Sequence, residues 1–257
     1  MTTRRMFRIY VLEAKSEILK MLRMPTYFIS TLAFPLMFYV FFGIVMNGKA
    51  AIGHTSIPAY LLGTYGSFGV IGATMFGFGV GVAVERGLGW LQVKRASPMP
   101  PFAYFVAKAV ACAFFSLIVV LSLFALGAAF GDVRMPFSKW VLLAVTLTAG
   151  TIPFSTLGLA ISYFAGPNSA PAVVNAIYLP MAFFSGLWIP LMFLPSAFRA
   201  AANIFPAYHF AQIALAVLGA PFRGDVLGHV EALVGFSMIF LGVAFLGHRR
   251  EQEKMYG

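Results

Sequence analysis

Long apolar runs alternate with short charged segments along most of the chain. A helix needs about 20 mostly apolar residues to span the hydrocarbon core of a bilayer. Six stretches meet this requirement, and they cover residues 26–47, 58–84, 102–130, 140–164, 172–188 and 229–247. The strong period-two alternation of a membrane barrel is absent from them. The pattern therefore predicts an all-α integral membrane protein with six transmembrane helices.

The residues before the first run, 1–25, have an amphipathic pattern of their own. When they are placed at about 100° per residue, apolar side chains such as Phe7, Val11 and Met21 share one face. The basic side chains expected on the other face are Arg8, Lys15, Lys20 and Arg23. We expect an interfacial helix that lies in the lipid headgroup layer. The alternative is an ordinary helix packed on a partner.

The apolar segment between the fifth and sixth runs, 189–226, differs from the six. Proline ends or kinks a helix because it lacks a backbone N–H. The segment is interrupted by Pro190, Pro195, Pro206 and Pro221. We therefore expect one or two short re-entrant helices that dip into the outer leaflet without crossing it.

The distribution of Lys and Arg sets the expected orientation, because cytoplasmic segments carry an excess of these residues. On one side of the predicted bundle lie 13 of the 18, namely Arg4, Arg5, Arg8, Lys15, Lys20, Arg23, Arg86, Lys94, Arg95, Lys108, Arg249, Arg250 and Lys254. Lys108 falls just inside the third run, where its long side chain is expected to snorkel to the interface. Six spans then place both chain ends in the cytoplasm. We expect a single domain over 1–257, made of the interfacial helix 1–25, the bundle 26–247 and a cytoplasmic tail 248–257.

Composition excludes several other classes of protein. Hydrophobic residues make up 60% and charged residues 10% of the chain, against roughly 25% charged in average soluble proteins. The net charge of +10 sits in short clusters beside apolar runs, so a nucleic-acid partner is not expected. The one cysteine, Cys112, excludes an intrachain disulfide. Residues 43–50 have phosphate-loop spacing but end in Ala50, where Ser or Thr should hold magnesium, and this match is rejected.

Side chains that could carry catalysis are scarce. The four histidines, His54, His209, His229 and His248, are far apart in the sequence and show no zinc-ligand spacing. A nucleophile-elbow sequence is also missing. Glu231 is the only acid inside a predicted span, near its outer end. It is either a functional membrane carboxylate or a carboxylate that reaches the surface, and the sequence leaves both readings open.

The second predicted span carries a ridge of small residues at Gly69, Ala73, Gly77 and Gly81. Such ridges let membrane helices approach closely. Static packing is the favoured interpretation, and a sliding contact used in gating is the alternative.

The charged loop 85–101 follows this span and ends in Pro98, Pro100 and Pro101. Its middle is expected to form a short helix across the cytoplasmic face, with Trp90, Leu91 and Val93 available to a partner. A solvated loop is the alternative, and composition does not separate the two.

Aromatic side chains recur on the first and fifth spans. Most of the 28 Phe, 10 Tyr and 3 Trp are expected to face lipid. A subset is a candidate lining for a path that a hydrophobic or amphipathic solute follows, namely Phe38, Phe42, Asn175, Tyr178, Phe184 and Trp188. Asn175 has a second interpretation as a hydrogen-bonding contact to a neighbouring helix.

The order and spacing of these features resemble the type-2 permease subunits of ATP-binding cassette exporters. The resemblance covers nearly the whole chain. The segments that carry it are 13–25 with 32–39 at the start, Glu85-Arg86-Gly87 with Ser97-Pro98 in the first cytoplasmic loop, and 184–190 with Leu194-Pro195 and 205–208 before the last span.

This resemblance implies a division of labour between subunits. Such permeases pair, commonly as a homodimer, and each copy docks a separate ATP-binding subunit, of which there are two. ATP and Mg would be bound by that partner, so this chain would be a transport subunit with no enzymatic activity and no cofactor of its own. The coupling loop in contact with the ATPase would comprise Glu85, Arg86, Gly87, Leu91, Arg95 and Pro98, and the outer gate would contain Pro190, Pro195 and Pro206.

We therefore expect an export permease for a hydrophobic or amphipathic compound, such as a drug or natural product, in the inner (plasma) membrane of a bacterial-type cell. Polysaccharide or glycolipid export is the alternative within the same family. A membrane-embedded enzyme would need clustered ionisable residues in one cavity, and an ion-coupled carrier would need internal repeats and buried mid-bilayer charges. Neither feature is evident in the sequence.

Overall fold

The structure is a computed structural model that describes residues 3–46, 50–97, 99–100 and 102–256. Helices form nearly all of it, and the prediction of an all-α chain is confirmed apart from two strands of two residues each. In chain order the elements are α1 (Thr3–Leu22), α2 (Pro25–Phe38), η1 (Tyr39–Val45), β1 (Ala51–Ile52), β2 (Thr55–Ser56), α3 (Ile57–Thr74), η2 (Met75–Val80), α4 (Gly81–Gly87), α5 (Trp90–Ala96), α6 (Ala103–Ala129), α7 (Phe137–Ala149), α8 (Thr151–Phe164), α9 (Ala170–Phe184), η3 (Leu191–Phe193), α10 (Ser196–Ala201), η4 (Ala202–Ile204), α11 (Pro206–Leu218) and α12 (Val226–Tyr256).

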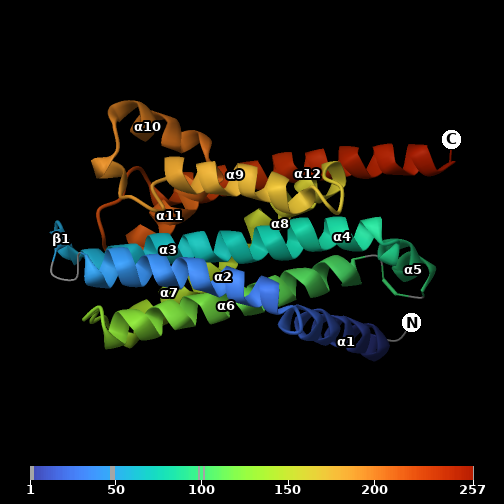
Figure 1. Cartoon of the computed structure of the whole chain (residues 1–257), viewed down its shortest axis with the longest axis horizontal. Coiled ribbons are helices and arrows are strands. Elements are labelled where there is room, and N and C mark those ends of the chain that lie inside the picture. Colours follow the sequence, from blue (N-terminus) through green and yellow to red (C-terminus); the bar gives the residue numbers. More distant parts are fainter. Residues whose placement is uncertain (1–2, 47–49, 98, 101, 257) are drawn as a thin grey trace.

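The centre of the molecule is one long helical rod made of α3, the π-helical turns of η2, and α4. It begins where the Ser56 hydroxyl accepts a hydrogen bond from the backbone N–H of Ala59, at 3.3 Å, with a proline in its first turn. Every residue of α3 is buried. Figure 1 shows α3 and α4 running through the middle of the molecule, with other helices above and below them.

Glycine allows this close packing. A Cβ atom added to Gly69 would lie 2.5 Å from a methyl carbon of Val119 on α6. Farther along, a Cβ atom on Gly158 of α8 would lie 3.0 Å from the backbone nitrogen of Gly79. Gly69 of the small-residue ridge therefore makes room for a side chain of α6, while the backbones of η2 and α8 meet at Gly79, outside the ridge. This close packing agrees with the packing interpretation.

The remaining helices surround the rod. α6, α2 and α11 contact α3, while α8 contacts η2 and α12. The interfacial segment α1 lies against α6. In Figure 1 the start of α1, the end of α12 and the short helix α5 lie at one end of the molecule, and β1 and α10 lie at the other.

Four helical segments are long and apolar enough to cross a membrane. They are Ile57–Gly87, Ala103–Ala129, Phe137–Phe164 and Val226–Glu251, and they match the second, third, fourth and sixth predicted runs. The first and fifth runs contain shorter apolar helices, Thr31–Val45 and Ala170–Phe184. The structure thus supports an integral membrane protein, and the count of six spans stays a prediction.

The proline-rich segment after α9 folds into short helices, as expected. The stretch Ser196–Ile204 meets α11 at a bend of 98°, at the junction where Pro206 opens α11. Pro195 lies directly before α10, and Pro190 directly before η3. Each proline marks the start of a new helix because it has no N–H for a preceding turn.

Candidate functional site

A long groove lies between α2, the α3–η2–α4 rod and α9, with a volume of about 1410 Å³. Aromatic side chains line one end of it, including Phe38, Tyr178 and Trp188. Charged side chains line the other end, among them Glu17 and Lys108. The groove is therefore amphipathic along its length.

The aromatic end joins three elements through ring contacts. The rings of Phe68 on α3 and Tyr178 on α9 stack with their centroids 4.8 Å apart. The ring centroid of Trp188 lies 5.6 Å from that of Phe68 and 5.7 Å from that of Phe38 on α2. The Tyr178 hydroxyl donates to the Phe68 carbonyl oxygen at 2.8 Å, and the Tyr65 hydroxyl donates to that of Trp188 at 3.1 Å.

A glycine makes room for this arrangement. A Cβ atom on Gly72 would lie 2.6 Å from the Tyr178 hydroxyl oxygen. The absence of a side chain at Gly72 lets Tyr178 reach across to α3 and keeps its ring at the groove wall. The aromatic end therefore depends on a small residue on the central rod as well as on the rings.

Four of the six residues predicted for a path line this groove, namely Phe38, Asn175, Tyr178 and Trp188. The other two lie outside the groove lining. The Phe42 ring stacks on Phe38 at 6.0 Å, and the Phe184 ring stacks on Phe205 of the outer segment at 5.7 Å. The end of α9 turns Phe184 towards the outer helices, and a role of these residues in a transport path stays a prediction.

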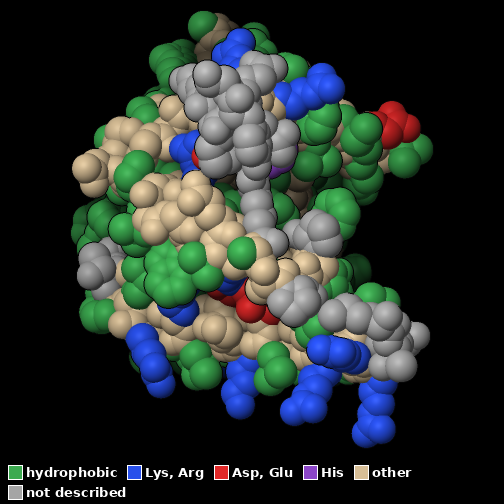
Figure 2. Space-filling model, turned by 90° about the vertical axis from the view of Figure 1, so that its right-hand side faces the viewer, with side chains coloured by type: hydrophobic (Ala, Val, Ile, Leu, Met, Phe, Trp, Pro, Cys, Tyr) green, Lys and Arg blue, Asp and Glu red, His purple; other side chains and the backbone are tan. Residues whose placement is uncertain are grey.

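The charged end of the groove belongs to a set of ion pairs that we call the ionic cluster. It contains three acids and three bases from four helices, namely Glu13, Glu17, Lys20, Glu85, Lys94 and Lys108. Its formal charge is therefore zero when all six groups are ionised. Acidic side chains are visible near the middle of this end of the molecule in Figure 2.

Lys108 is the most buried member of the cluster, with 1% of its side chain exposed. Its Nζ lies 2.8 Å from Glu85 and 3.2 Å from Glu17. Lys20 pairs with both of these acids, at 2.8 Å from Glu17, and the Tyr104 hydroxyl donates to Glu85. The expectation that Lys108 snorkels to the interface is wrong, because two carboxylates stabilise its charge inside the protein.

Two members on α1 have shifted pKa values. Burial alone would raise the pKa of Glu17, but the positive charges of Lys108, Lys20 and Lys94 more than offset it and lower this pKa to about 2. Burial alone would lower the pKa of Lys20, but Glu85 and Glu17 raise it above its ordinary value. Both groups are thus charged at neutral pH, and the cluster ties α1 to α4, α5 and α6.

The first residues of the predicted coupling loop are folded against the rest of the chain. The Glu85 side chain is 11% exposed and lies in the ionic cluster. Arg86 donates to the carbonyl oxygen of Ala165 at 3.0 Å and pairs with Glu251 at 3.3 Å. These side chains hold the loop in place from its inner side. The side chain of Arg95, and Pro98 as a whole, lie outside the described residues.

The middle of the loop forms α5, which agrees with the helical alternative. It follows Gly89, whose φ of +78° suits glycine. Leu91 is buried. The side chains that project outward are Leu88, Trp90 and Val93, which are 68%, 55% and 63% exposed. An apolar surface therefore lies at the end of the molecule where α5 appears in Figure 1.

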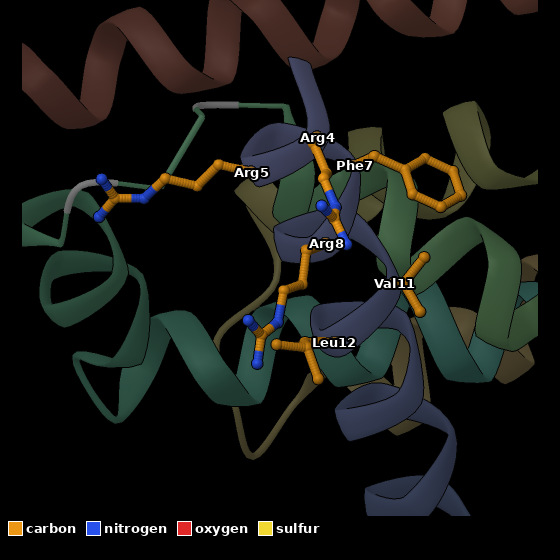
Figure 3. Close-up of a pocket in the computed structure, with 6 residues that line it drawn as sticks. All are labelled: Arg4, Arg5, Phe7, Arg8, Val11 and Leu12. Atoms are coloured by element: carbon orange, nitrogen blue, oxygen red, sulfur yellow. The ribbon is translucent and has the colours of Figure 1, made fainter. Parts of the chain in front are cut away.

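The four basic residues predicted for the interfacial helix divide into two groups. Arg8, Lys15 and Arg23 are exposed, whereas Lys20 takes part in the ionic cluster. The predicted apolar face is also divided, since Met21 is buried and Phe7 is 71% exposed. In Figure 3, Phe7 extends from the start of α1 to the side away from Arg8. The rest of the chain therefore covers only part of this face, and the interfacial location of α1 stays a prediction.

The structure brings together two histidines that lie 20 positions apart. The Nδ1 atoms of His209 on α11 and His229 on α12 are 2.9 Å apart. Their Nε2 atoms lie 3.0 Å and 2.6 Å from the carbonyl oxygens of Asn203 and Arg223. The sequence held no signal for this contact, because it depends on the bend before α11. Within the described residues, no group of three or more His, Cys, Asp or Glu side chains is arranged to hold a metal ion. Glu231 is exposed on α12, and both readings of it stay open.

Comparison with known proteins places these features in a family. The sequence pattern of the family described as "ABC-2 type transporter" matches residues 10–219. The chain is also 25% identical over 245 residues to the "Putative transport permease YvfS" of Bacillus subtilis (strain 168), a match that covers 92% of this chain and 96% of the relative. Since the family match covers more than half of the sequence, the chain belongs to the ABC-2 type transporter family and is an integral membrane transport permease.

Proposed function

We propose that the chain is the membrane subunit of an ATP-driven exporter for a hydrophobic or amphipathic compound, such as a drug or natural product. The observation that carries this proposal is the groove with its aromatic end and its charged end. The apolar part of such a compound fits between the rings of Phe38, Tyr178 and Trp188, and its polar part fits beside the ionic cluster. Because the cluster is neutral overall, it offers hydrogen bonds without selecting one sign of charge.

Six crossings with both ends in the cytoplasm are part of this proposal. The four long helices supply four crossings, and α2 with η1 and α9 supply the first and the fifth. The start of α1 and the end of α12 lie at the same end of the molecule in Figure 1, which supports an even number of crossings. The excess of Lys and Arg at that end favours a cytoplasmic location in a bacterial inner membrane.

ABC-2 permeases generally work with an ATP-binding subunit, and we assign its docking site here to α5. Leu88, Trp90 and Val93 supply an exposed apolar surface of the kind that anchors a partner. Glu85 and Arg86 act as positioning residues behind it, through the ionic cluster and Glu251. ATP and Mg would be bound by this separate subunit, present in two copies, and this chain would catalyse no hydrolysis.

A second copy of the chain would complete the transport path. α2 and α9 border the groove, and both expose large apolar side chains, including Met37 and Ile177; Phe41 on η1, which continues α2, is exposed as well. A homodimer that pairs these edges would enclose the two grooves in one central path. The short helices that begin at Pro190, Pro195 and Pro206 would then form the outer gate, tied to α3 by the Tyr65 hydrogen bond to Trp188.

The proposal is tested by reconstitution into inverted vesicles with and without the ATP-binding subunit. We expect ATP-dependent uptake of a hydrophobic dye only when both proteins are present. The Trp90→Ala variant should lose association with the ATP-binding subunit by roughly 1–3 kcal/mol, as expected for an exposed aromatic anchor. The matched control is Phe137→Ala, which removes an aromatic that is 82% exposed at the start of α7.

The outcomes separate the rival functions. Uptake by this chain alone, driven by an ion gradient, would refute the ATP-dependent mechanism. ATP-dependent movement of a labelled glycolipid or polysaccharide, with no uptake of the dye, would support the alternative within the same family.

A further inference from the structure

Two histidine rings face each other where α11 meets α12, at a place that the proposed transport path does not include. The Nδ1 atoms of His209 and His229 are 2.9 Å apart. The Nε2 atoms lie beside backbone carbonyl oxygens, that of Asn203 at 3.0 Å and that of Arg223 at 2.6 Å. A carbonyl oxygen only accepts hydrogen bonds, so each Nε2 carries a proton. The lone pairs of both Nδ1 atoms are therefore directed at the space between the rings, where they can hold a cation.

The fixing of both Nε2 atoms is typical of histidines that bind metals. A metal-ligating histidine usually donates its other N–H to a carbonyl or carboxylate oxygen, which sets the tautomer and orients the ring. The ring centroids of His209 and His229 are 5.1 Å apart, so the two Nδ1 atoms lie close to the line that joins the rings. The His229 side chain is also buried. The fold thus holds two ligand nitrogens nearly in line with each other.

This geometry favours a metal ion that takes two ligands in a line. Zinc in a structural site is tetrahedral and needs four ligands, and no third His, Cys, Asp or Glu of the described residues joins this pair. The rings of Tyr208 and Phe236 lie beside His209, with centroids 5.2 Å and 6.0 Å from its own. Such apolar neighbours limit the access of the waters that would complete the coordination of a divalent ion. A monovalent d¹⁰ ion, Cu⁺ or Ag⁺, is satisfied by two imidazole nitrogens alone.

A monovalent ion also leaves the charge at this place unchanged. In the metal-free chain, two Nδ1 atoms at this distance share one proton, and the pair carries a charge of +1. Exchange of that proton for Cu⁺ or Ag⁺ releases one H⁺ and keeps the charge at +1. A divalent ion would add positive charge without a carboxylate to offset it, because Asp225 accepts a hydrogen bond from the backbone N–H of Gly228.

We propose that His209 and His229 form a binding site for a monovalent d¹⁰ metal ion, Cu⁺ or Ag⁺, through their Nδ1 atoms. With metal–nitrogen bonds of about 2 Å, as for zinc, the two nitrogens must be about 4 Å apart, so the rings separate by roughly 1 Å on binding. Both rings lie in the first turn of a helix, since α11 begins at Pro206 and α12 at Val226. The ion would tie the outer segment to the last helix, and this proposal does not depend on what the protein transports.

The experiment uses the full chain in detergent, in a Cys112→Ala background, with Ag⁺ in chloride-free buffer as the probe. We expect calorimetry to show one Ag⁺ bound per chain at this pair, with the release of one proton. In nitrogen NMR of labelled histidine, the Nδ1 signals of two histidines should shift and couple to the silver nucleus, while their Nε2 atoms keep their protons. A hydrogen bond between the rings produces no such coupling.

Two matched variants locate the site. His229→Gln should weaken the binding of Ag⁺ by more than the roughly 10–100-fold that is typical when a hydrogen-bond partner of a metal ligand is lost. His54→Gln replaces an exposed histidine between β1 and β2 and should leave the affinity and the coupling unchanged. Ag⁺ should raise the temperature of unfolding of the parent and of the His54 variant, but not that of the His229 variant. The silver coupling in the parent decides the matter even if the His229 variant does not fold.

Three results would overturn the proposal. The first is the absence of silver coupling at the Nδ1 signals of the parent, which would place any bound Ag⁺ elsewhere, for example on methionine sulfur. The second is an unchanged affinity for Ag⁺ in the folded His229 variant. The third is tighter binding of Zn²⁺ than of Ag⁺ by the same two histidines, which would show that further ligands complete a tetrahedral site.

Discussion

Lys108 shows how a charged residue can lie inside an apolar helix of this protein. It is the only basic residue of the 27-residue helix α6, and its side chain is almost completely buried between Glu85 and Glu17. Removing a charge from water costs several kcal/mol, which close pairing and further hydrogen bonds must offset. The carboxylates of α1 and α4 supply this compensation, so burial of Lys108 depends on both helices being in place.

Replacement of this one side chain tests that dependence. Lys108→Met should lower the free energy of unfolding by about 3 kcal/mol, because Glu85 and Glu17 would remain buried with one partner fewer. Arg134→Met is the control, since Arg134 is 83% exposed and pairs only with the equally exposed Asp132, and it should change stability by less than about 1 kcal/mol. Thermal unfolding in detergent measures both. Equal stability of the Lys108 variant and the parent would contradict the account of the cluster.

The attachment of α1 should also depend on pH. Glu17 has a lowered pKa, so its contribution is complete above the ordinary value of 4.5 and is lost as pH falls towards 2. Lys20 has a raised pKa, so its contribution is complete below 10.5 and is lost as pH rises beyond that value. Spin labels at Ser16→Cys and Val93→Cys should report a constant distance between these limits and a longer one outside them. In the Glu17→Gln variant the acid step should disappear.

Gly69 is a position where a single methyl group should matter. Its Cβ would lie 2.5 Å from Val119 and 3.3 Å from Pro35, so Gly69→Ala should cost about 1–3 kcal/mol by overpacking. At Gly242 of α12, no atom of the described chain lies within 4 Å of an added Cβ. Gly242→Ala should therefore be neutral or stabilise the helix by up to about 1 kcal/mol. The same unfolding assay compares the two, and a tolerated Gly69→Ala would show that α3 and α6 can move apart.

At the scale of helices, the apolar runs were informative because burial and lipid exposure both require apolar side chains. The length of the apolar runs was therefore enough to locate the α3–η2–α4 rod, α6, the α7–α8 segment and α12. The same reasoning did not show that α3 is enclosed on every side, because lipid and protein make the same demand on composition. It also did not show which part of α1 the rest of the chain covers, since Met21 and Phe7 are equally apolar but only Met21 is buried.

Two histidine rings meet where α11 contacts α12. In the His209–His229 pair both Nε2 atoms donate to carbonyl oxygens, so the short Nδ1–Nδ1 contact requires one shared proton and a charge of +1 on the pair. Arg223 and Tyr208 are close to these rings, and Asp225 uses its carboxylate to accept a hydrogen bond from the backbone N–H of Gly228.

We therefore expect one proton to be shared between the Nδ1 atoms of the two rings. Nitrogen NMR of labelled histidines should show this shared proton. His54→Gln, which replaces an exposed histidine between β1 and β2, should leave these signals unchanged. The His229→Gln variant should abolish them, and a shared-proton signal that persists in that variant would contradict the pairing.

At the scale of the whole molecule, the site is assembled from segments that are distant in the sequence. Lys20 meets Glu85 across 65 positions, and Tyr178 meets Phe68 across 110. Helical periodicity predicted which side chains share a face of one helix. Periodicity carries no information on which helix faces meet. The groove and the ionic cluster could therefore not be predicted from it, although most of their residues were singled out one by one in the sequence.

Access of water to the groove can be measured directly. Asn175 lines the groove and is exposed, so a thiol at Asn175→Cys should react with a membrane-impermeant reagent applied from the cytoplasmic side. Met238 is 67% exposed on α12, where hydrocarbon should suppress thiolate formation, and Met238→Cys should react at least roughly tenfold more slowly. Both are made in a Cys112→Ala background. Equal labelling would mean that the groove is filled with lipid.

The enclosure of α3 has a consequence for how the protein is made. This helix is synthesised early, but α6, α8 and α11, which cover it, leave the ribosome later. The segment is apolar enough to enter the bilayer by itself, but its glycines leave spaces that side chains of the later helices fill, so its final packing must wait for those helices. Biogenesis would then finish only when α11 arrives, and a ribosome stalled before that point would hold an open bundle that membrane proteases recognise.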